Sequence, residues 1–183
     1  MATNYAGFRQ SRFGPSRVHH CAAVRRPGRR TAHGPWCAAG HAGQVDQAAI
    51  AASDGLIDIA AVTAVWQDAL RIPAWSGQPA WTHADLSPGN LLVRDGRLTA
   101  VIDWDIAGVG DSTVDLIVAW NLLPASARRA FREALAVDDD AWHRGRGWAL
   151  SISLIQLPYY QNTNPALAAN SRHVIAEILA DAG

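Results

Sequence analysis

The stretch HADLSPGNLLVRDGRLTAVIDWD, residues 83–105, decides the fold of this chain. It begins as a polar loop that turns at a Ser-Pro-Gly sequence. Two apolar-rich segments follow, residues 91–94 and 97–102, and Asp95-Gly96 joins them. An Asp-Gly pair between two such segments is a strong signal for the two-residue turn of a β-hairpin. The stretch therefore predicts a polar loop that leads directly into a hairpin.

The register of this hairpin follows from its turn. With a two-residue turn, Val93 lies opposite Leu98, and Asn90 lies opposite Val101. Successive side chains of a strand point to opposite faces. The residues expected to face the core are therefore Leu91, Val93, Leu98, Ala100 and Ile102.

The other face of the hairpin carries the candidate metal ligands. Asn90 and Asp103 become diagonal neighbours there, about 7 to 8 Å apart at the backbone. Two side chains at that separation can reach one hard cation through oxygen ligands at roughly 2.1 Å, as Mg²⁺ requires. Asp85 lies within loop reach of the same point. The pattern predicts a carboxylate beside a magnesium site.

These residues resemble a known family. The matching elements are His83-Ala84-Asp85 with Asn90, then Ile102-Asp103-Trp104-Asp105, and then Gly110-Asp111-x-x-x-Asp115-Leu116. In spacing and order they resemble the catalytic loop and metal-binding turn of aminoglycoside phosphotransferases and the related choline and homoserine kinases. The resemblance implies a protein-kinase-like fold, of which residues 44–183 would form the C-terminal lobe. The expected class is α+β, mainly helical, with the hairpin carrying the catalytic segment.

The resemblance also implies roles for single residues. Asp85 would be the catalytic aspartate that orients or accepts the proton of a substrate hydroxyl, and Asn90 and Asp103 would hold Mg²⁺ against the phosphates of ATP or GTP. His83, Asp111 and Asp115 would support the catalytic loop. The expected substrate is a small-molecule alcohol of aminoglycoside type. Ala84 stands where the family usually has glycine, and Trp104-Asp105 replace the Phe-Gly of the kinase Asp-Phe-Gly turn.

Other interpretations of the same residues are weaker. An isolated Asp-x-Asp such as Asp103 to Asp105 would suit a glycosyltransferase metal site no better than a surface turn. A hydrolase that used Ser87 as its nucleophile lacks the Gly-x-Ser-x-Gly elbow, and Ser87 precedes a proline. Asp111 is also better suited to capping a helix than to catalysis, because the sequence Ser112 to Asp115 has the form of a capping box.

Helices are predicted on both sides of the hairpin. Asp58 is expected to cap a helix whose buried face is Val62, Val65, Trp66 and Ala69. The other expected helices are 45–52, 124–136, 139–160 and 165–182, with Asn164 as a cap for the last. The acidic run at residues 138–140 favours the positive end of a helix dipole over a site for a cationic substrate.

The N-terminal segment differs from the rest of the chain. Residues 1–45 hold seven arginines and no acidic residue, so the remaining residues have nine arginines against sixteen acids, a net charge of −7. We interpret residues 1–43 as a basic segment that is disordered or not native sequence. A polyanion-binding arm, a transit-like peptide and translation in a shifted frame stay open, and the Arg, Ala, Gly, Pro and His mixture favours the last. A nucleic-acid partner is not expected.

The absence of lysine limits the functional prediction. A kinase of the resembled type needs a Gly-rich loop and a lysine paired with a helical glutamate to hold the nucleotide phosphates. All sixteen basic residues are arginine, and no glutamate precedes the motifs. We therefore expect this chain alone to have little or no activity. The alternatives are a kinase completed by another chain, and an inactive remnant or a module that binds a metal or a partner.

Location and association complete the expectations. Composition predicts a cytoplasmic protein without a membrane span or signal peptide. The interface that a missing lobe would leave exposed predicts self-association. The acceptor, the preferred nucleotide and the oligomeric state do not follow from the sequence.

Overall fold

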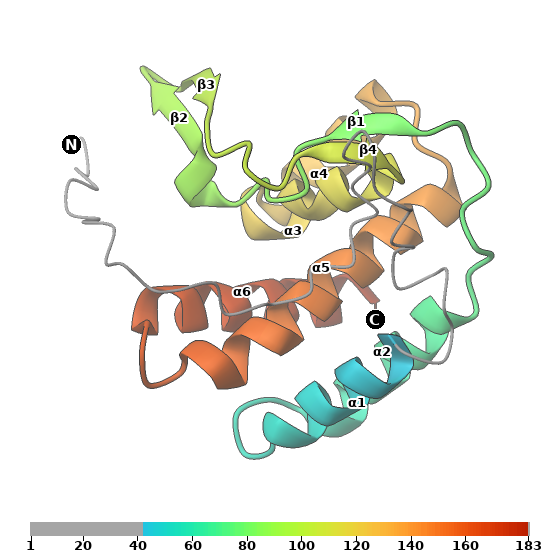
Figure 1. Cartoon of the computed structure of the whole chain (residues 1–183), viewed down its shortest axis with the longest axis vertical. Helices are drawn as coiled ribbons and strands as arrows, with labels where there is room; N and C mark the ends of the chain where they lie inside the picture. Colours follow the sequence, from blue (N-terminus) through green and yellow to red (C-terminus); the bar gives the residue numbers. More distant parts are fainter. Residues whose placement is uncertain (1–41, 183) are drawn as a thin grey trace.

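The structure, a computed structural model, describes residues 42–182, with side chains from 47 to 181 (Figure 1). The elements in chain order are α1 (Ala42–Ala52), α2 (Ile59–Leu70), β1 (Ala80–Thr82), η2 (Pro88–Asn90), β2 (Leu91–Arg94), β3 (Arg97–Val101), β4 (Gly108–Gly110), η3 (Ser112–Ile117), α3 (Val118–Asn121), α4 (Ala125–Ala134), α5 (Asp139–Tyr160) and α6 (Pro165–Ala182). The η elements are 3₁₀ helices. The predicted hairpin strands and helices are all present, with ends shifted by at most three residues.

The helix α5 is the centre of the molecule. It packs along α6 and η3 and also contacts α1 and α2, so that α1, α2, α5, α6 and η3 form one helical body (Figure 1). Leu150, Leu154 and Leu157 of α5 are fully buried in its core. The residues predicted to form the buried face of α2, Val62, Val65, Trp66 and Ala69, are buried as expected.

A glycine allows α5 to approach η3 closely. A Cβ atom added to Gly145 would lie 2.6 Å from Leu116 Cβ and 3.2 Å from the carbonyl oxygen of Thr113. Cβ contacts below 3.0 Å do not occur without a shift of one partner. Gly145 therefore sets the distance between the central helix and the segment that carries Asp115.

Side-chain caps begin several helices where the sequence predicts them. Asp58 accepts a hydrogen bond from the backbone N of Ala61, at 3.0 Å, and begins α2. Asp138 accepts from the N of Ala141, at 2.7 Å, so the acidic run caps α5. Asn164 accepts from the N of Leu167, at 3.2 Å, at the start of α6. The prediction that these carboxylates and this carboxamide begin helices is confirmed.

A buried arginine connects the end of the chain to the middle. Arg128 of α4 is 4% exposed and forms an ion pair with Glu177 of α6. Its Nε donates to the carbonyl oxygen of Ala119, at 2.9 Å. Asp181 accepts from the indole N–H of Trp120 at 3.2 Å and lies 3.7 Å from the same guanidinium. Because Arg128 is almost inaccessible to water, these partners compensate its charge and fix α3 and α4 on α6.

The strands form two separate antiparallel pairs. β1 pairs with β4, with Trp81 opposite Val109, and β2 pairs with β3. The β1–β4 pair was not predicted, because strands of three residues carry too little alternation to be recognised. It matters for the site, since β1 ends at Thr82 and leads directly into the loop at His83.

The predicted hairpin register is correct only near the turn. Arg94 lies opposite Arg97 and Val93 opposite Leu98, as expected. A bulge between Leu92 and Val93 then shifts the ladder by one residue, so Leu91 lies opposite Val101. Beyond the strand ends, the carbonyl oxygen of Asn90 accepts from the N of Ile102 at 2.9 Å. Asn90 is therefore opposite Ile102 and not Val101, and the alternation argument that placed Asn90 and Asp103 on one face was wrong.

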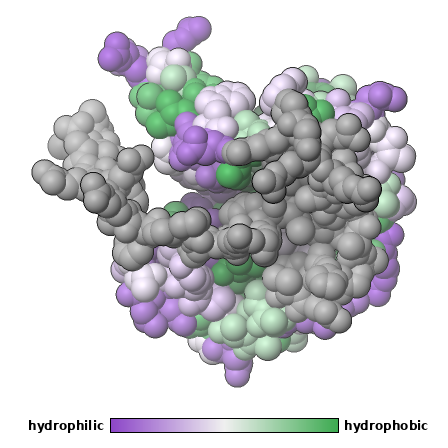
Figure 2. All heavy atoms as spheres, in the orientation of Figure 1, coloured by the Kyte–Doolittle hydropathy of each residue, from purple (hydrophilic) through white to green (hydrophobic). Residues whose placement is uncertain are grey.

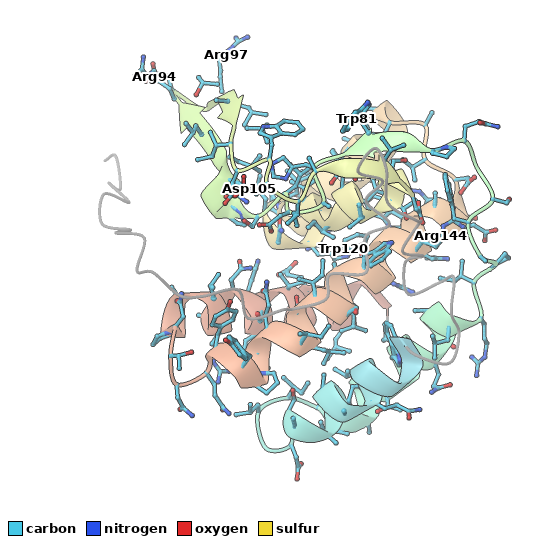
Figure 3. All side chains as sticks on the ribbon, in the orientation of Figure 1. Trp81, Arg94, Arg97, Asp105, Trp120 and Arg144 are labelled. Atoms are coloured by element: carbon cyan, nitrogen blue, oxygen red, sulfur yellow. The ribbon has the colours of Figure 1, made fainter. Side chains whose placement is uncertain are left out.

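The prediction that one face of the hairpin lies in the core was also wrong. Val93, Leu98 and Ile102 are 60, 59 and 41% exposed, and Leu91 and Ala100 are only half-buried. The hairpin projects from the body in Figure 1, and in Figure 2 it carries hydrophobic surface below a hydrophilic tip. Arg94 and Arg97 form that tip (Figure 3). Alternation determines which residues share a face, but a second layer is needed to cover it.

The fold class predicted from the sequence is confirmed. The described part is α+β and mainly helical, with the hairpin next to the loop that bears the catalytic candidates. None of the helices between residues 42 and 182 combines the length and hydropathy needed to cross a membrane. The interpretation of residues 1–43 falls almost entirely outside the described residues, so the division at residue 44 stays a prediction.

Candidate functional site

Asp115 holds the start of the loop that contains the catalytic candidate. Its two carboxylate oxygens accept hydrogen bonds from the backbone N atoms of His83 and Ala84, each at 2.8 Å. Ala84 has a φ of 66° and is 2% exposed. This left-handed conformation favours glycine, so the alanine is held in a strained geometry. The two hydrogen bonds from Asp115 stabilise the backbone at this position.

The environment of Asp115 shifts its ionisation. Burial raises the pKa of the carboxyl group from its ordinary value of 3.8, because a low-dielectric surrounding disfavours the charged form. The backbone N–H groups of His83 and Ala84 act in the opposite direction and offset part of this effect. Burial therefore disfavours the charged form of Asp115, and the hydrogen bonds from the backbone N–H groups of His83 and Ala84 partly compensate this cost.

Asp111 supports the same segment from its beginning. Its Oδ1 accepts from the N of Thr113, at 3.0 Å, and caps η3. Its Oδ2 lies 3.8 Å from the guanidinium Nε of Arg144, which α5 contributes. Arg144 is 8% exposed and also donates to the carbonyl oxygen of Pro73 at 3.5 Å. The predicted N-cap function of Asp111 is confirmed, and η3 is fixed to α5 through it.

His83 connects the loop to the far end of the hairpin. Its Nε2 lies 2.9 Å from the carbonyl oxygen of Ile102, and its Nδ1 accepts from the N of Asp85 at 3.2 Å. A ring that accepts at Nδ1 must carry its proton at Nε2, so the geometry selects the neutral tautomer with Nε2–H. Trp104 packs on the ring edge-on, with 4.7 Å between the centroids. His83 is 3% exposed and therefore orients the loop without access to a substrate.

Asp85 and Asn90 are directly bonded to each other. The amide Nδ2 of Asn90 donates to the backbone oxygen of Asp85 at 2.9 Å and to its carboxylate Oδ2 at 3.0 Å. Both side chains are half-buried. Because Nδ2 is used in this way, the carbonyl Oδ1 of Asn90 is the atom left to bind another group. The five-residue spacing seen in the sequence is therefore the spacing that closes this loop on itself.

Asp103 directly follows Ile102, the residue whose carbonyl oxygen is bonded to the His83 ring. It has a φ of 64°, so the chain leaves strand geometry there and the pleat no longer determines where its side chain points. The side chain is exposed and makes no hydrogen bond or ion pair with any residue from 47 to 181. Asp105, labelled in Figure 3 near the base of the hairpin, is also exposed. Asp103 is thus a carboxylate available to an external cation.

The donor chemistry fits Mg²⁺ with additional ligands. No group of three or more His, Cys, Asp or Glu side chains able to hold a metal occurs in the described part of the chain. One carboxylate and one carboxamide oxygen are nevertheless hard ligands, and Mg²⁺ commonly takes few protein ligands and completes its shell with water and substrate phosphates. Asn90 and Asp103 would therefore each offer one hard oxygen ligand of the kind that Mg²⁺ takes.

An open pocket borders the carboxylate of Asp85. Its polar lining is Asp85, Ser87, Asn121, Ser153, Gln156 and Asn170, from the loop, α3, α5 and α6. Asn121 Nδ2 also donates to the carbonyl oxygen of Leu86 at 2.9 Å, which fixes the loop on α3. Asp85 therefore lines a small hollow that is open to solvent, between the loop and the helices α3, α5 and α6.

Comparison with known proteins identifies the family. A sequence model of the family described as "Phosphotransferase enzyme family" matches residues 16–148. The chain belongs to this family. The resemblance inferred from the loop and hairpin motifs is thereby confirmed, although the match begins earlier than the residue 44 at which we placed it.

The relatives of this phosphotransferase-family chain are longer proteins. An aminoglycoside 3'-phosphotransferase from Escherichia coli is 39% identical over 59 residues, which are 32% of this chain and 22% of that enzyme. One from Salmonella typhimurium is 32% identical over 76 residues, which are 39% of this chain and 28% of that enzyme. The structure of a thermostable mutant of the aminoglycoside phosphotransferase APH(4)-Ia, in ternary complex with AMP-PNP and hygromycin B, is 26% identical with a TM-score of 0.47. The similarity covers 81% of this chain and 52% of that one, so the chain spans about half the length of this structure and less of the curated relatives.

Sequence reasoning missed part of the candidate site. The structure brings together His83, Asp85, Asn90 and Asp115 by direct hydrogen bonds, and Asp111 supports them through η3. Asn121, Gln156 and Asn170 were not considered, because they are single polar residues within helices and no motif marks them. An amide among apolar neighbours on the buried side of a helix was the only available signal.

Proposed function

We propose that this chain carries the catalytic and acceptor-binding part of a small-molecule phosphotransferase. It would transfer a phosphate group from ATP or GTP, with Mg²⁺, to a hydroxyl of a small molecule. The relatives act on aminoglycosides by name, so an aminoglycoside-like alcohol is the first candidate. The observation that carries the proposal is the bonded pair of Asp85 and Asn90 at the edge of the pocket.

Asp85 and Asn90 have different roles in this proposal. Asp85 lines the pocket, where its carboxylate would accept a hydrogen bond from an acceptor hydroxyl and take its proton. The new P–O bond forms as the bond between the γ-phosphorus and the bridging oxygen breaks, and the nucleoside diphosphate leaves. Asn90 orients that carboxylate through Nδ2 and keeps its own Oδ1 for the cation. Asp103 would supply the second ligand. Bound Mg²⁺ neutralises negative charge on the phosphates, and His83 and Asp115 keep the loop in place.

The lysine-free sequence limits activity in this proposal. Phosphoryl transfer depends mainly on positioning and charge stabilisation, and the loss of one preorganised donor costs on the order of 3 kcal/mol, or about a hundredfold in rate. The 183-residue polypeptide has no lysine to hold the α- and β-phosphates. We therefore expect this polypeptide alone to turn over slowly or not at all. A lysine supplied from outside these 183 residues would then be needed for full activity.

The ordered loop with its bonded Asp85–Asn90 pair also supports a second function. A chain with an ordered loop and a partial Mg²⁺ site, but without phosphate-binding lysine, could act as a non-catalytic module that binds a metal or a partner. The exposed apolar residues of the hairpin support association with another chain or a second copy. Magnesium binding without nucleotide favours the module, and tight nucleotide binding favours the kinase. The cytoplasmic location predicted from the sequence is part of the same proposal.

Turnover with defined variants tests the proposal. ATP and Mg²⁺ are supplied with a panel of aminoglycosides, macrolides and choline-like alcohols, and ADP release is measured at high enzyme concentration. We expect weak phosphorylation that is lost in Asp85→Asn and retained in Asp54→Asn, which makes the same change at an exposed surface position. Phosphorylation that survives Asp85→Asn would contradict the role of Asp85. Robust turnover lost in that variant would refute the expectation of low activity and establish the kinase.

A further inference from the structure

The pocket beside Asp85 is almost free of charge. Asp85 is the one charged residue among those that line it, and the other polar groups are hydroxyls and carboxamides, from Ser87, Asn121, Ser153, Gln156 and Asn170. The remaining lining is isoleucine, alanine and valine. Such a surface offers several neutral donors and acceptors but only one site that compensates a positive charge.

One of the carboxamides, that of Asn121, is held in a defined orientation. Asn121 donates through Nδ2 to the carbonyl oxygen of Leu86, which fixes its Oδ1 on the other side. That oxygen is enclosed and has no hydrogen-bond partner among residues 47–181. Gln156 Oε1 lies 3.5 Å from the hydroxyl of the completely buried Ser171, which donates at 3.0 Å to the carbonyl oxygen of Leu167. The amide of Asn121 is therefore positioned by the fold before any ligand enters.

The acidic residues that could attract a polycation lie elsewhere. Asp138 caps α5 and Asp139 forms an ion pair with Arg132. Asp139 precedes Ser153 by fourteen residues of one helix, which corresponds to roughly 20 Å along the axis at 1.5 Å per residue. On α6, Glu177 is used by the buried guanidinium of Arg128. Asp103 and Asp105 are exposed near the same loop, but they are not among the residues that line the pocket. Most of the net charge of −7 beyond residue 45 therefore lies outside the pocket, where Asp85 is the one charged residue of the lining.

We propose that this pocket binds a neutral polyhydroxyl compound, such as a sugar or a cyclitol, in preference to a polycationic aminoglycoside. The inference rests on the proposed function only for the statement that the bound molecule is the phosphate acceptor. Hydroxyl groups can exchange water for Gln156, Asn170 and Ser153 without leaving a charge unpaired. Several ammonium groups would meet only one carboxylate, and the others would lose hydration without a counter-charge. The carboxylate of Asp85 remains free to orient one hydroxyl.

Binding by the full 183-residue chain tests this preference. The probes are maltotriose and myo-inositol, which are neutral, and kanamycin, an aminoglycoside with several ammonium groups. Side-chain amide NMR signals of Asn121, Gln156 and Asn170 report occupancy of the pocket, at 50 and 500 mM NaCl. We expect at least one neutral probe to shift these signals with an affinity that salt does not change. Kanamycin should bind mainly through surface charge, and weaken at least tenfold at the higher salt.

A charge introduced into the pocket should reverse the preference. Gln156→Glu is expected to raise the affinity for kanamycin relative to the neutral probe by about tenfold. Asn170→Asp makes the same kind of change from α6, so that a folding defect in one variant does not decide the result. Gln67→Glu, on the exposed surface of α2, is the matched control and should leave the ratio unchanged.

Two results would overturn the proposal. One is kanamycin shifting the pocket amides more strongly than both neutral probes at 500 mM NaCl, and the other is no response to either neutral probe. AMP-PNP with Mn²⁺ is added to the same samples as a separate readout. A neutral probe that binds while nucleotide and metal do not would contradict the proposed phosphotransferase function and leave the specificity of the pocket established.

Discussion

The helical body and the β2–β3 hairpin both contain regularly spaced apolar residues, but these are buried in the body and exposed on the hairpin. Val62 and Trp66 on α2 are 0 and 1% exposed, whereas Val93 and Leu98 on the hairpin are 60 and 59% exposed. α2 lies against α5, α6 and α1, and the main contacts of the hairpin strands are with each other. Periodicity thus predicts which residues share a face, and burial depends on whether another element covers that face. The hairpin follows the loop of the candidate site directly, so this loop lies between the helical body and an exposed apolar surface.

The largest expected effect tests this contrast with one substitution in each region. Leu154→Ala removes a fully buried side chain from α5 and should lower the free energy of unfolding by about 2 to 5 kcal/mol. Leu98→Ala makes the same chemical change on the hairpin and should alter it by at most about 0.5 kcal/mol. Urea unfolding followed by circular dichroism measures both. Similar losses for the two variants would show that the hairpin is covered in solution.

The second effect tests how tightly the body carries the site. Gly145→Ala places a methyl group against Leu116 and should cost about 1 to 3 kcal/mol through overpacking. Gly89→Ala is the control, because a Cβ atom there would meet nothing within 4 Å. The amide NMR signals of His83 and Ala84 should shift in the first variant, since η3 carries Asp115. Unchanged stability and signals would mean that α5 does not determine the position of η3.

The third effect concerns pH and the buried carboxylate of Asp115. Because burial raises its pKa in the folded state, folding favours the protonated form. This contribution to stability is fully present below the unfolded value of 3.8 and is lost as pH rises through the folded pKa. Asp115→Asn cannot titrate, and it removes one acceptor for the N–H groups of His83 and Ala84, at a cost of about 1 to 2 kcal/mol.

Unfolding of this pair as a function of pH measures that contribution. The excess stability of the unmodified chain over Asp115→Asn should be largest near pH 3.5 and decrease toward pH 7. An excess that grows with pH would show that the hydrogen bonds from His83 and Ala84 outweigh burial, and would reverse the direction of the pKa shift.

The smallest effect is expected at Asn121. Asn121→Ala removes the hydrogen bond to the Leu86 oxygen, worth about 1 kcal/mol, but also removes a buried oxygen without a partner. We therefore expect a net loss below about 1 kcal/mol, with faster amide hydrogen exchange between residues 85 and 90. Exchange at Val62, in the body, is the internal control. Equal acceleration at both places would mean global destabilisation and not release of the loop.

Local sequence signals predicted most of this fold, and they failed where long-range contacts decide. The Asp-Gly turn gave both hairpin strands, and Asp58, Asp138 and Asn164 marked helix starts because capping is a contact within a few residues. The bulge at Leu92 and Val93 left no trace in the pattern, and it shifted Asn90 to a different partner. The β1–β4 pair joins residues about 28 positions apart, beyond the reach of local periodicity.

In the candidate site, too, the sequence predicted the parts that local spacing determines and missed those that depend on long-range packing. Asp85 and Asn90 were identified through spacing and resemblance, and the structure explains the spacing by the hydrogen bonds between them. The expected support from Asp115 corresponds to two bonds to the loop backbone, and its accompanying effect on the pKa depends on burial that no local pattern contains. Asn121, Gln156 and Asn170 meet only after three helices have packed, so they could not be found from the sequence.

Whether Asn90 and Asp103 bind one divalent cation beside Asp85 can be measured directly. Mn²⁺, a paramagnetic substitute for Mg²⁺, is titrated into the ¹⁵N-labelled chain with AMP-PNP, and line broadening of backbone amides is recorded. We predict that Asp85, Asn90 and Asp103 broaden first, that Mg²⁺ competes, and that Asp103→Asn removes the effect while Asp140→Asn on the exposed acidic run does not. Broadening that begins at residues 138–140, or that is unchanged in Asp103→Asn, would contradict the assignment of this metal site.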